Sequence, residues 1–139
     1  MNKIISIGVG IAALFLIEEQ ARNTFLGFRG PYVYIAAGVE DSKIIQGGTA
    51  RFFFDFDHIK FCQDNLARFV ATQPDNAIVY RDSVPGGAVG LGKQHVVNPF
   101  KLPPELRVGK YKFRVFANSE CRDGVHSTPA PEIEFEIVE

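Results

Sequence analysis

From residue 31 onward, apolar and polar side chains alternate along several short stretches of the chain. In residues 49–61, Phe lies at every second position from 52 to 56, and the opposite face carries Arg51, Asp55 and Asp57 with Phe53 among them. A similar alternation recurs in residues 110–118 and 132–138. A period of two with one apolar face is typical of strands whose sheet packs on one side only. The pattern therefore predicts β-structure.

Seven stretches rich in β-branched and aromatic residues are separated by Gly, Pro, Asn and Asp, which favour turns. Seven strands at such close spacing are typical of a sandwich of two sheets. We therefore expect an all-β domain over residues 32–139. The expected strands are residues 32–39, 49–61, 67–72, 77–81, 95–100, 110–118 and 132–138.

The N-terminal residues have a different composition. Residues 4–17 carry no charge, Lys3 precedes them and Glu18 follows them. This resembles the layout of a signal peptide, but small residues are missing at the two positions that a cleavage site needs. We expect an uncleaved apolar helix over residues 1–22, although 14 apolar residues are short against the roughly 20 that span a bilayer. A cleaved secreted domain and a helix buried in a larger assembly are the alternatives.

The predicted helix has features that bear on association and orientation. Small residues recur four positions apart, which lets two helices approach closely and favours self-association. Lys3 favours a cytoplasmic N-terminus and so an extracytoplasmic β-domain, periplasmic or extracellular, although Arg22 and Arg29 on the other flank compete with it. Residues 23–31 form the expected linker. The small residues are Ser6, Gly8, Gly10 and Ala12.

The composition indicates a globular protein and argues against some classes of function. The 139 residues suit one domain. Apolar residues make up 46% and charged residues 22%, which is ordinary for a globular protein. A net charge of −1 gives no electrostatic basis for binding nucleic acid.

The segment 106–115 (LRVGKYKFRV) carries a family resemblance. It resembles the entry into the sixth strand of fibronectin type III and immunoglobulin-like domains. There a Leu and a turn with Gly precede the Tyr of the tyrosine corner. The resemblance implies a seven-stranded immunoglobulin-like sandwich in which the Tyr111 hydroxyl caps the corner, with Leu106 and Gly109 beside it. The chain departs from the antibody pattern, because it has no Trp and because Cys121 lies ten residues past Tyr111.

Cys62 and Cys121 are compatible with a disulfide, two free thiols or half of a metal site. In the sandwich interpretation both lie at one pole, where a disulfide would join a turn at 63–65 to a loop at 119–131. The alternative is tetrahedral zinc on two Cys and two His, although the short Cys-x2-Cys spacing of strong zinc motifs is missing. The four residues of that alternative are His58, Cys62, Cys121 and His126.

No pattern of catalytic residues stands out. The Gly-rich stretch 86–92 lacks the Gly-Lys-Ser/Thr ending of a phosphate loop and predicts a loop at the pole of the sandwich. No Ser lies in a Gly-x-Ser-x-Gly elbow. We therefore expect a non-enzymatic module without a cofactor.

The expected role is structural or protein-binding. Residues 4–17 would hold the module in a membrane, or within an assembly such as a virion or envelope complex. We expect the pole with the two cysteines to face this anchor and the C-terminal edge to point away and contact protein partners. A small zinc protein or enzyme, and a secreted immunoglobulin-like domain, are the alternative functions.

Overall fold

The computed structural model describes residues 30–139. The predicted helix at 1–22, its proposed packing residues and most of the predicted linker at 23–31 lie outside the described residues. Nine β-strands form within the described range, and this part of the chain is all β, as predicted. The strands are β1 Tyr32–Val39, β2 Lys43–Ile45, β3 Thr49–His58, β4 Gln63–Thr72, β5 Ile78–Pro85, β6 Gly92–Lys101, β7 Gly109–Cys121, β8 Gly124–Pro129 and β9 Ile133–Val138.

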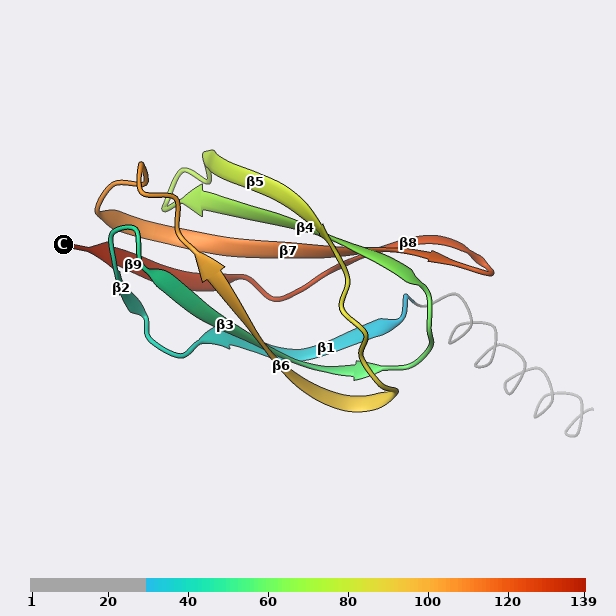
Figure 1. The fold of residues 1–139 in the computed structure, drawn as a ribbon. Helices are drawn as coiled ribbons and strands as arrows, with labels where there is room; N and C mark the ends of the chain where they lie inside the picture. Colours follow the sequence, from blue (N-terminus) through green and yellow to red (C-terminus); the bar gives the residue numbers. More distant parts are fainter. Residues whose placement is uncertain (1–29) are drawn as a thin grey trace, which may run out of the picture.

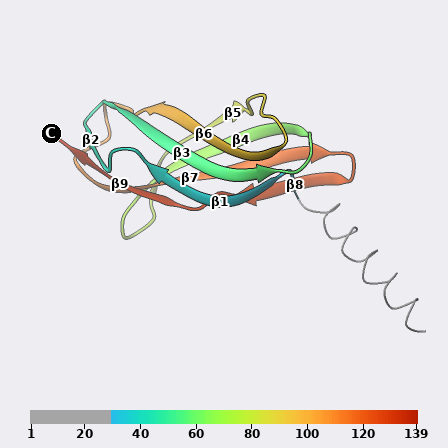
Figure 2. The ribbon, with the colours of Figure 1, turned by 90° about the horizontal axis from the view of Figure 1, so that it is seen from below.

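Two sheets pack face to face as a sandwich (Figures 1 and 2). One sheet has the strand order β1-β3-β6, and the other has the order β2-β9-β7-β4-β5, with β8 also pairing with β7. All pairs are antiparallel except β2 with β9, which is parallel. Strands β5 and β6 end their respective sheets, so the sandwich has an open side between them.

Strand β7 is the central strand of the larger sheet. Along one edge it pairs with β4, and along the other its first residues pair with β9 and its last with β8. Strand β8 ends at Pro129, and Pro131 lies before β9; neither proline has an N–H for a ladder hydrogen bond. Between them, the backbone N–H of Ala130 donates to the carbonyl of Val115 at 2.9 Å. The chain therefore keeps its place beside β7 across the break.

The core lies where the inward faces of the two sheets meet. Phe52 of β3 stacks on Phe113 of β7, with ring centroids 4.0 Å apart, and both side chains are buried. The alternation predicted for residues 52–56, 110–118 and 132–138 is confirmed, because the apolar positions of these strands are buried. Burial of large aromatic side chains is the main stabilising contribution in a domain of this size.

The predicted number of strands was wrong: the described residues form nine, not seven. Strand β2 has only three residues, too few to show an alternation. Strand β8 has the sequence GVHSTP and buries no side chain fully, so it carries no apolar signal. Both strands form because a neighbouring strand offers backbone partners, β9 to β2 and β7 to β8.

Several predicted boundaries were also wrong. Residues 63–65, expected as a turn, are the start of β4, and the expected loop at 119–131 contains the end of β7 and all of β8. Strand β5 runs on to Pro85, and β3 stops at His58. The extensions of β4 and β7 are largely polar and pair with each other, for example Gln63 with Glu120. Backbone pairing explains them, and it leaves no apolar pattern in the sequence.

The described chain begins and ends at opposite ends of the sandwich (Figures 1 and 2). Gly30 lies against Thr128 of β8, whereas the carbonyl of Val138 near the C-terminus accepts a 2.8 Å hydrogen bond from the backbone of Gln46. Among residues 30–139, no helix is long and apolar enough to cross a membrane.

Candidate functional site

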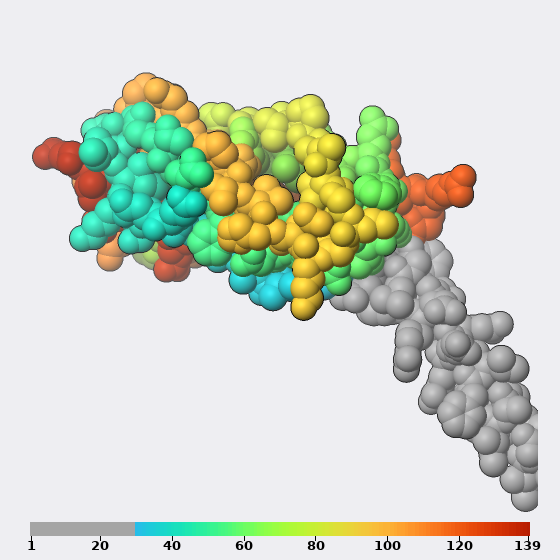
Figure 3. Space-filling model, turned by 60° about the horizontal axis from the view of Figure 1, so that its bottom comes forward, coloured from blue at the N-terminus to red at the C-terminus, as the bar shows by residue number. Residues whose placement is uncertain are grey.

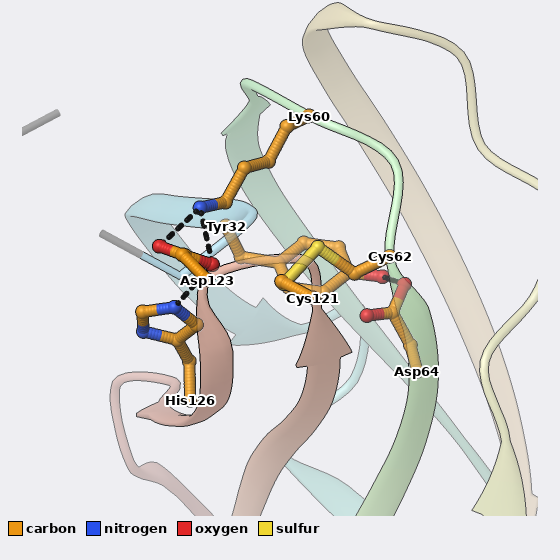
Figure 4. Close-up of a disulfide and its surroundings, with 7 residues drawn as sticks. All are labelled: Tyr32, Lys60, Cys62, Asp64, Cys121, Asp123 and His126. Atoms are coloured by element: carbon orange, nitrogen blue, oxygen red, sulfur yellow. Dashed lines mark hydrogen bonds and ion pairs between the residues drawn. A yellow bond between two sulfur atoms is a disulfide. The ribbon is translucent and has the colours of Figure 1, made fainter. Parts of the chain in front are cut away.

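A disulfide joins Cys62 to Cys121 and confirms the predicted pairing (Figure 4). It connects the residue just before β4 to the last residue of β7, with the two Cα atoms 4.8 Å apart. Because β4 and β7 are neighbours, the bond lies within one sheet and not between the two. We call this end of the sandwich the disulfide pole: Gly30, the 59–62 and 122–123 turns, and the 86–91 loop between β5 and β6.

On one side of the disulfide, Asp123 binds two basic side chains (Figure 4). Its carboxylate accepts hydrogen bonds from Lys60 Nζ at 3.3 Å and from His126 Nε2 at 3.1 Å. The hydrogen bond from His126, followed by that from Lys60, holds the pKa of Asp123 below its usual range. These contacts link the 59–62 turn to the β7–β8 hairpin beside the disulfide.

On the other side, Tyr32 passes behind the disulfide and reaches Asp64 (Figure 4). The Tyr32 hydroxyl donates to Asp64 Oδ2 at 2.5 Å. Burial first, and then the hydrogen bond to this carboxylate, raise the pKa of Tyr32, so the phenol remains a donor at neutral pH. Asp64 Oδ1 is buried and has no hydrogen-bond partner among the described residues.

His58 lies beneath the 86–91 loop and is almost fully buried. Its ring stacks on Tyr32 with centroids 5.1 Å apart, and its Nδ1 donates to the carbonyl of Gly90 at 2.9 Å. Because a carbonyl can only accept, the proton lies on Nδ1, and in the neutral ring Nε2 is an acceptor. This Nε2 is also buried without a partner in the described part of the chain.

An inter-sheet cavity of about 240 Å³ opens between β5 and β6. Figure 3 shows a hollow in the surface between the gold-to-orange residues of β6 and the yellow residues around the 86–91 loop. Aromatic side chains of β1 and β3 and aliphatic side chains of β4 to β7 line it, with Gly86, Gly87 and Val89 of the loop. The lining side chains of the strands include Tyr32, Tyr34, Phe54, Phe56, Leu66, Val84, Val96 and Val115.

Tyr34 brings a second phenol to this cavity. Burial, and then the negative charge of Asp64, raise the pKa of Tyr34 to about 12. Its ring packs edge-on against Phe54 and Phe56, with centroids 6.3 and 5.8 Å apart. The cavity therefore combines an apolar aromatic wall with a polar end at Tyr32 and Asp64.

The disulfide removes the basis of the zinc alternative. Zinc binds cysteine as thiolate, and the sulfurs of Cys62 and Cys121 are bonded to each other. The ligand atoms of Cys121, Asp123 and His126 lie within 4.8 Å of one another, but His58 is not a member of this group. The four residues proposed from the sequence are therefore not assembled as one site.

Tyr111 lies at the other end of β7, away from the disulfide. Its hydroxyl donates to the carbonyl of Arg107 at 2.6 Å, and its ring stacks on Phe135 of β9. Leu106 is buried beside it in the core, and Gly109 is the first residue of β7. This hydrogen bond runs back to the backbone four residues upstream.

The cavity and its polar end were not predicted from the sequence. Asp64 was placed in a turn, whereas it lies in β4 and points toward Tyr32 (Figure 4). Tyr32 and Tyr34 lie two positions apart in a predicted strand, which would place both on one face. That signal identifies a shared face, but the sequence does not show that Asp64 lies opposite.

Similar solved structures support a β-sandwich domain. No protein-family model matches the sequence, and no curated protein matches it. The C-terminal domain of Wzt is similar in structure, with a TM-score of 0.57 and 13% identity over 80% of this chain and 75% of that one. The sporulation control protein Spo0M of Bacillus subtilis reaches a TM-score of 0.48 and 16% identity over 80% of this chain and 51% of that one. The likeness to Wzt shows the fold alone.

Proposed function

We propose that this protein is a non-enzymatic, membrane-anchored binding module with its β-sandwich on the extracytoplasmic side. Residues 4–17 would form the anchor, and the disulfide pole would face it. The proposal rests on the position at which the chain enters the domain. Gly30 lies against His126 and Thr128 of β8 at the disulfide pole, and the C-terminus lies at the opposite end of the sandwich (Figures 1 and 2). The far end would then be presented to protein partners. The same geometry would suit a component of a virion or envelope complex, with residues 4–17 embedded in the assembly.

Exposed apolar side chains at the disulfide pole support this orientation. Phe61 is 70% exposed in the 59–62 turn, and Val125 is 76% exposed near the tip of the β7–β8 hairpin. Large apolar residues at loop tips are unfavourable in water but suit the interfacial region of a bilayer, where Phe partitions readily. A domain held with this pole toward the membrane would place both side chains there.

The disulfide supports an extracytoplasmic location. Disulfides persist in oxidising compartments and are rare in the cytosol. Lys3 at the start of the apolar segment favours the same orientation.

We further infer that the sandwich is of immunoglobulin-like type. In its favour are the strand order of the two sheets, the short β2 running parallel to β9, and the hydrogen bond from the Tyr111 hydroxyl to Arg107. Immunoglobulin-like folds host many unrelated functions, and many of them present loops or edges to partners.

Fractionation of the full chain tests the anchor. With a C-terminal epitope tag, we expect the protein to stay in the membrane pellet after carbonate extraction and to be degraded by protease added outside the cytoplasm. Ile11→Arg should release it, because a charge at the centre of a spanning helix costs about 2.5–3.5 kcal/mol. Ile11→Leu is the matched control and should remain in the pellet. A soluble product whose new N-terminus lies beyond residue 17 would overturn the proposal in favour of the secreted alternative.

A further inference from the structure

Two buried hydrogen-bond acceptors that have no partner among residues 30–139 lie beneath the 86–91 loop, next to the inter-sheet cavity. They are Asp64 Oδ1 and His58 Nε2. We propose that this place binds a small amine with an apolar body, its ammonium group against Asp64 and His58 and its apolar body between the sheets. The proposal does not depend on the membrane anchor.

The two acceptor atoms at the polar end require a hydrogen-bond donor. Asp64 already accepts one hydrogen bond from Tyr32 through Oδ2, and His58 already donates through Nδ1 to Gly90. What remains on each is an acceptor, and a buried acceptor without a donor costs about 1–3 kcal/mol. An ammonium group offers three N–H donors and a positive charge opposite the Asp64 carboxylate. Asp64 and His58 line the same pocket, and an ammonium group has enough donors for both unpartnered atoms.

The apolar part of the cavity suits a ligand with a hydrocarbon group. The cavity of about 240 Å³ is larger than the roughly 150 Å³ engineered cavity that binds benzene. Tyr32, Tyr34, Phe54 and Phe56 supply an aromatic wall, whose ring faces also attract a cation. A phenyl group with a two-carbon chain is of suitable size for this space.

The 86–91 loop connects the two ends. Gly87 and Val89 line both the inter-sheet cavity and the pocket that contains His58 and Asp64. The backbone N–H of Gly86 donates to the carbonyl of Asp64 at 3.0 Å, which holds the loop against β4. One molecule lying under this loop can therefore reach both the polar and the apolar part.

Other ligand classes fit less well. An organic acid would bring a second negative charge to Asp64. A divalent cation would satisfy Asp64 and His58 but leave the neighbouring apolar cavity unexplained. An alcohol could donate one hydrogen bond, without the charge.

Isothermal titration of the purified full chain with three probes of one shape tests the proposal. We expect 2-phenylethylamine to bind at one site, 2-phenylethanol to bind at least about tenfold more weakly, and phenylacetate not to bind. Binding of the amine should be unchanged by EDTA. Equal affinity for amine and alcohol, loss of amine binding in EDTA, or no heat from the amine at millimolar concentration would each overturn the proposal.

Variants locate the site. Asp64→Asn should weaken amine binding at least about tenfold and reduce the preference for amine over alcohol. Val96→Phe should weaken binding of both by filling the cavity. Glu134→Gln, on the exposed face of β9, is the matched control and should bind the amine as the parent does. Because either site variant could misfold, each is first compared with the parent by circular dichroism and thermal unfolding. A folded Asp64→Asn protein with parental affinity would contradict the assignment.

Discussion

At the residue scale, Tyr34 and Tyr111 differ in the hydrogen bonding of their hydroxyl groups. Both tyrosine rings pack against phenylalanine rings of the sandwich, with Tyr111 on Phe135. The Tyr111 hydroxyl donates to the carbonyl of Arg107, whereas the Tyr34 hydroxyl has no hydrogen-bond partner among residues 30–139. The Tyr111 contact is local, because Arg107 lies four residues upstream. The surroundings of Tyr34 depend on distant residues, since its ring packs against Phe54 and Phe56 of β3.

Removing each hydroxyl should therefore have different effects. Tyr111→Phe leaves the Arg107 carbonyl without its donor and should lower the free energy of unfolding by about 1 kcal/mol. Tyr34→Phe loses no hydrogen bond and should change it by less than about 0.5 kcal/mol. Urea unfolding followed by circular dichroism measures both. Equal losses in the two variants would mean that the Tyr111 bond adds nothing to stability.

At the scale of an element, the 86–91 loop depends on one close approach. A Cβ at Gly86 would lie 2.7 Å from Cβ of Asp64, closer than two such atoms can approach. A Cβ at Gly87 would meet nothing within 4 Å. The sequence shows a Gly-rich loop in both places, and only the packing of the loop on β4 distinguishes them.

Gly86→Ala should push the loop away from β4 and destabilise the fold by about 1–3 kcal/mol, the usual cost of overpacking. Gly87→Ala, the neighbouring control, should leave stability unchanged or raise it by up to about 1 kcal/mol, since it reduces the freedom of the unfolded chain. Thermal unfolding compares the two. A Gly86→Ala protein as stable as the parent would show that the loop does not need this contact.

At the scale of the whole molecule, the disulfide constrains the unfolded chain. It closes a loop between residues 59 positions apart, Cys62 and Cys121. In the chain-entropy model a loop of this length contributes about 4 kcal/mol. That is a large share of the roughly 5–15 kcal/mol by which domains are usually stable.

The double variant Cys62→Ser/Cys121→Ser should lose about 4 kcal/mol of unfolding free energy, measured by urea denaturation. Reductant should lower the stability of the parent toward that of the variant and leave the variant unchanged. A parent whose unfolding midpoint does not respond to complete reduction would contradict a stabilising role for the bond.

The sequence by itself determined which side chains form the core. Alternation is a local property: every second residue of a strand faces the same way, so Phe52, Phe113 and Phe135 could be assigned to the interior without knowing their partners. The expected order of strands placed the two cysteines at one pole, but the sequence left a disulfide, free thiols and a metal site open. The apolar segment at 4–17 is equally plain in the sequence, and its role stays a prediction.

Only the tertiary structure decided the rest, because it depends on partners distant in the chain. Strands β2 and β8 exist because β9 and β7 offer them backbone hydrogen bonds. The polar end of the cavity exists because β4 brings Asp64 to Tyr32, which is 32 residues away. Asp64 and His58 are ordinary polar residues in the sequence, and their unpartnered atoms become visible only once the sheets pack and exclude water from them.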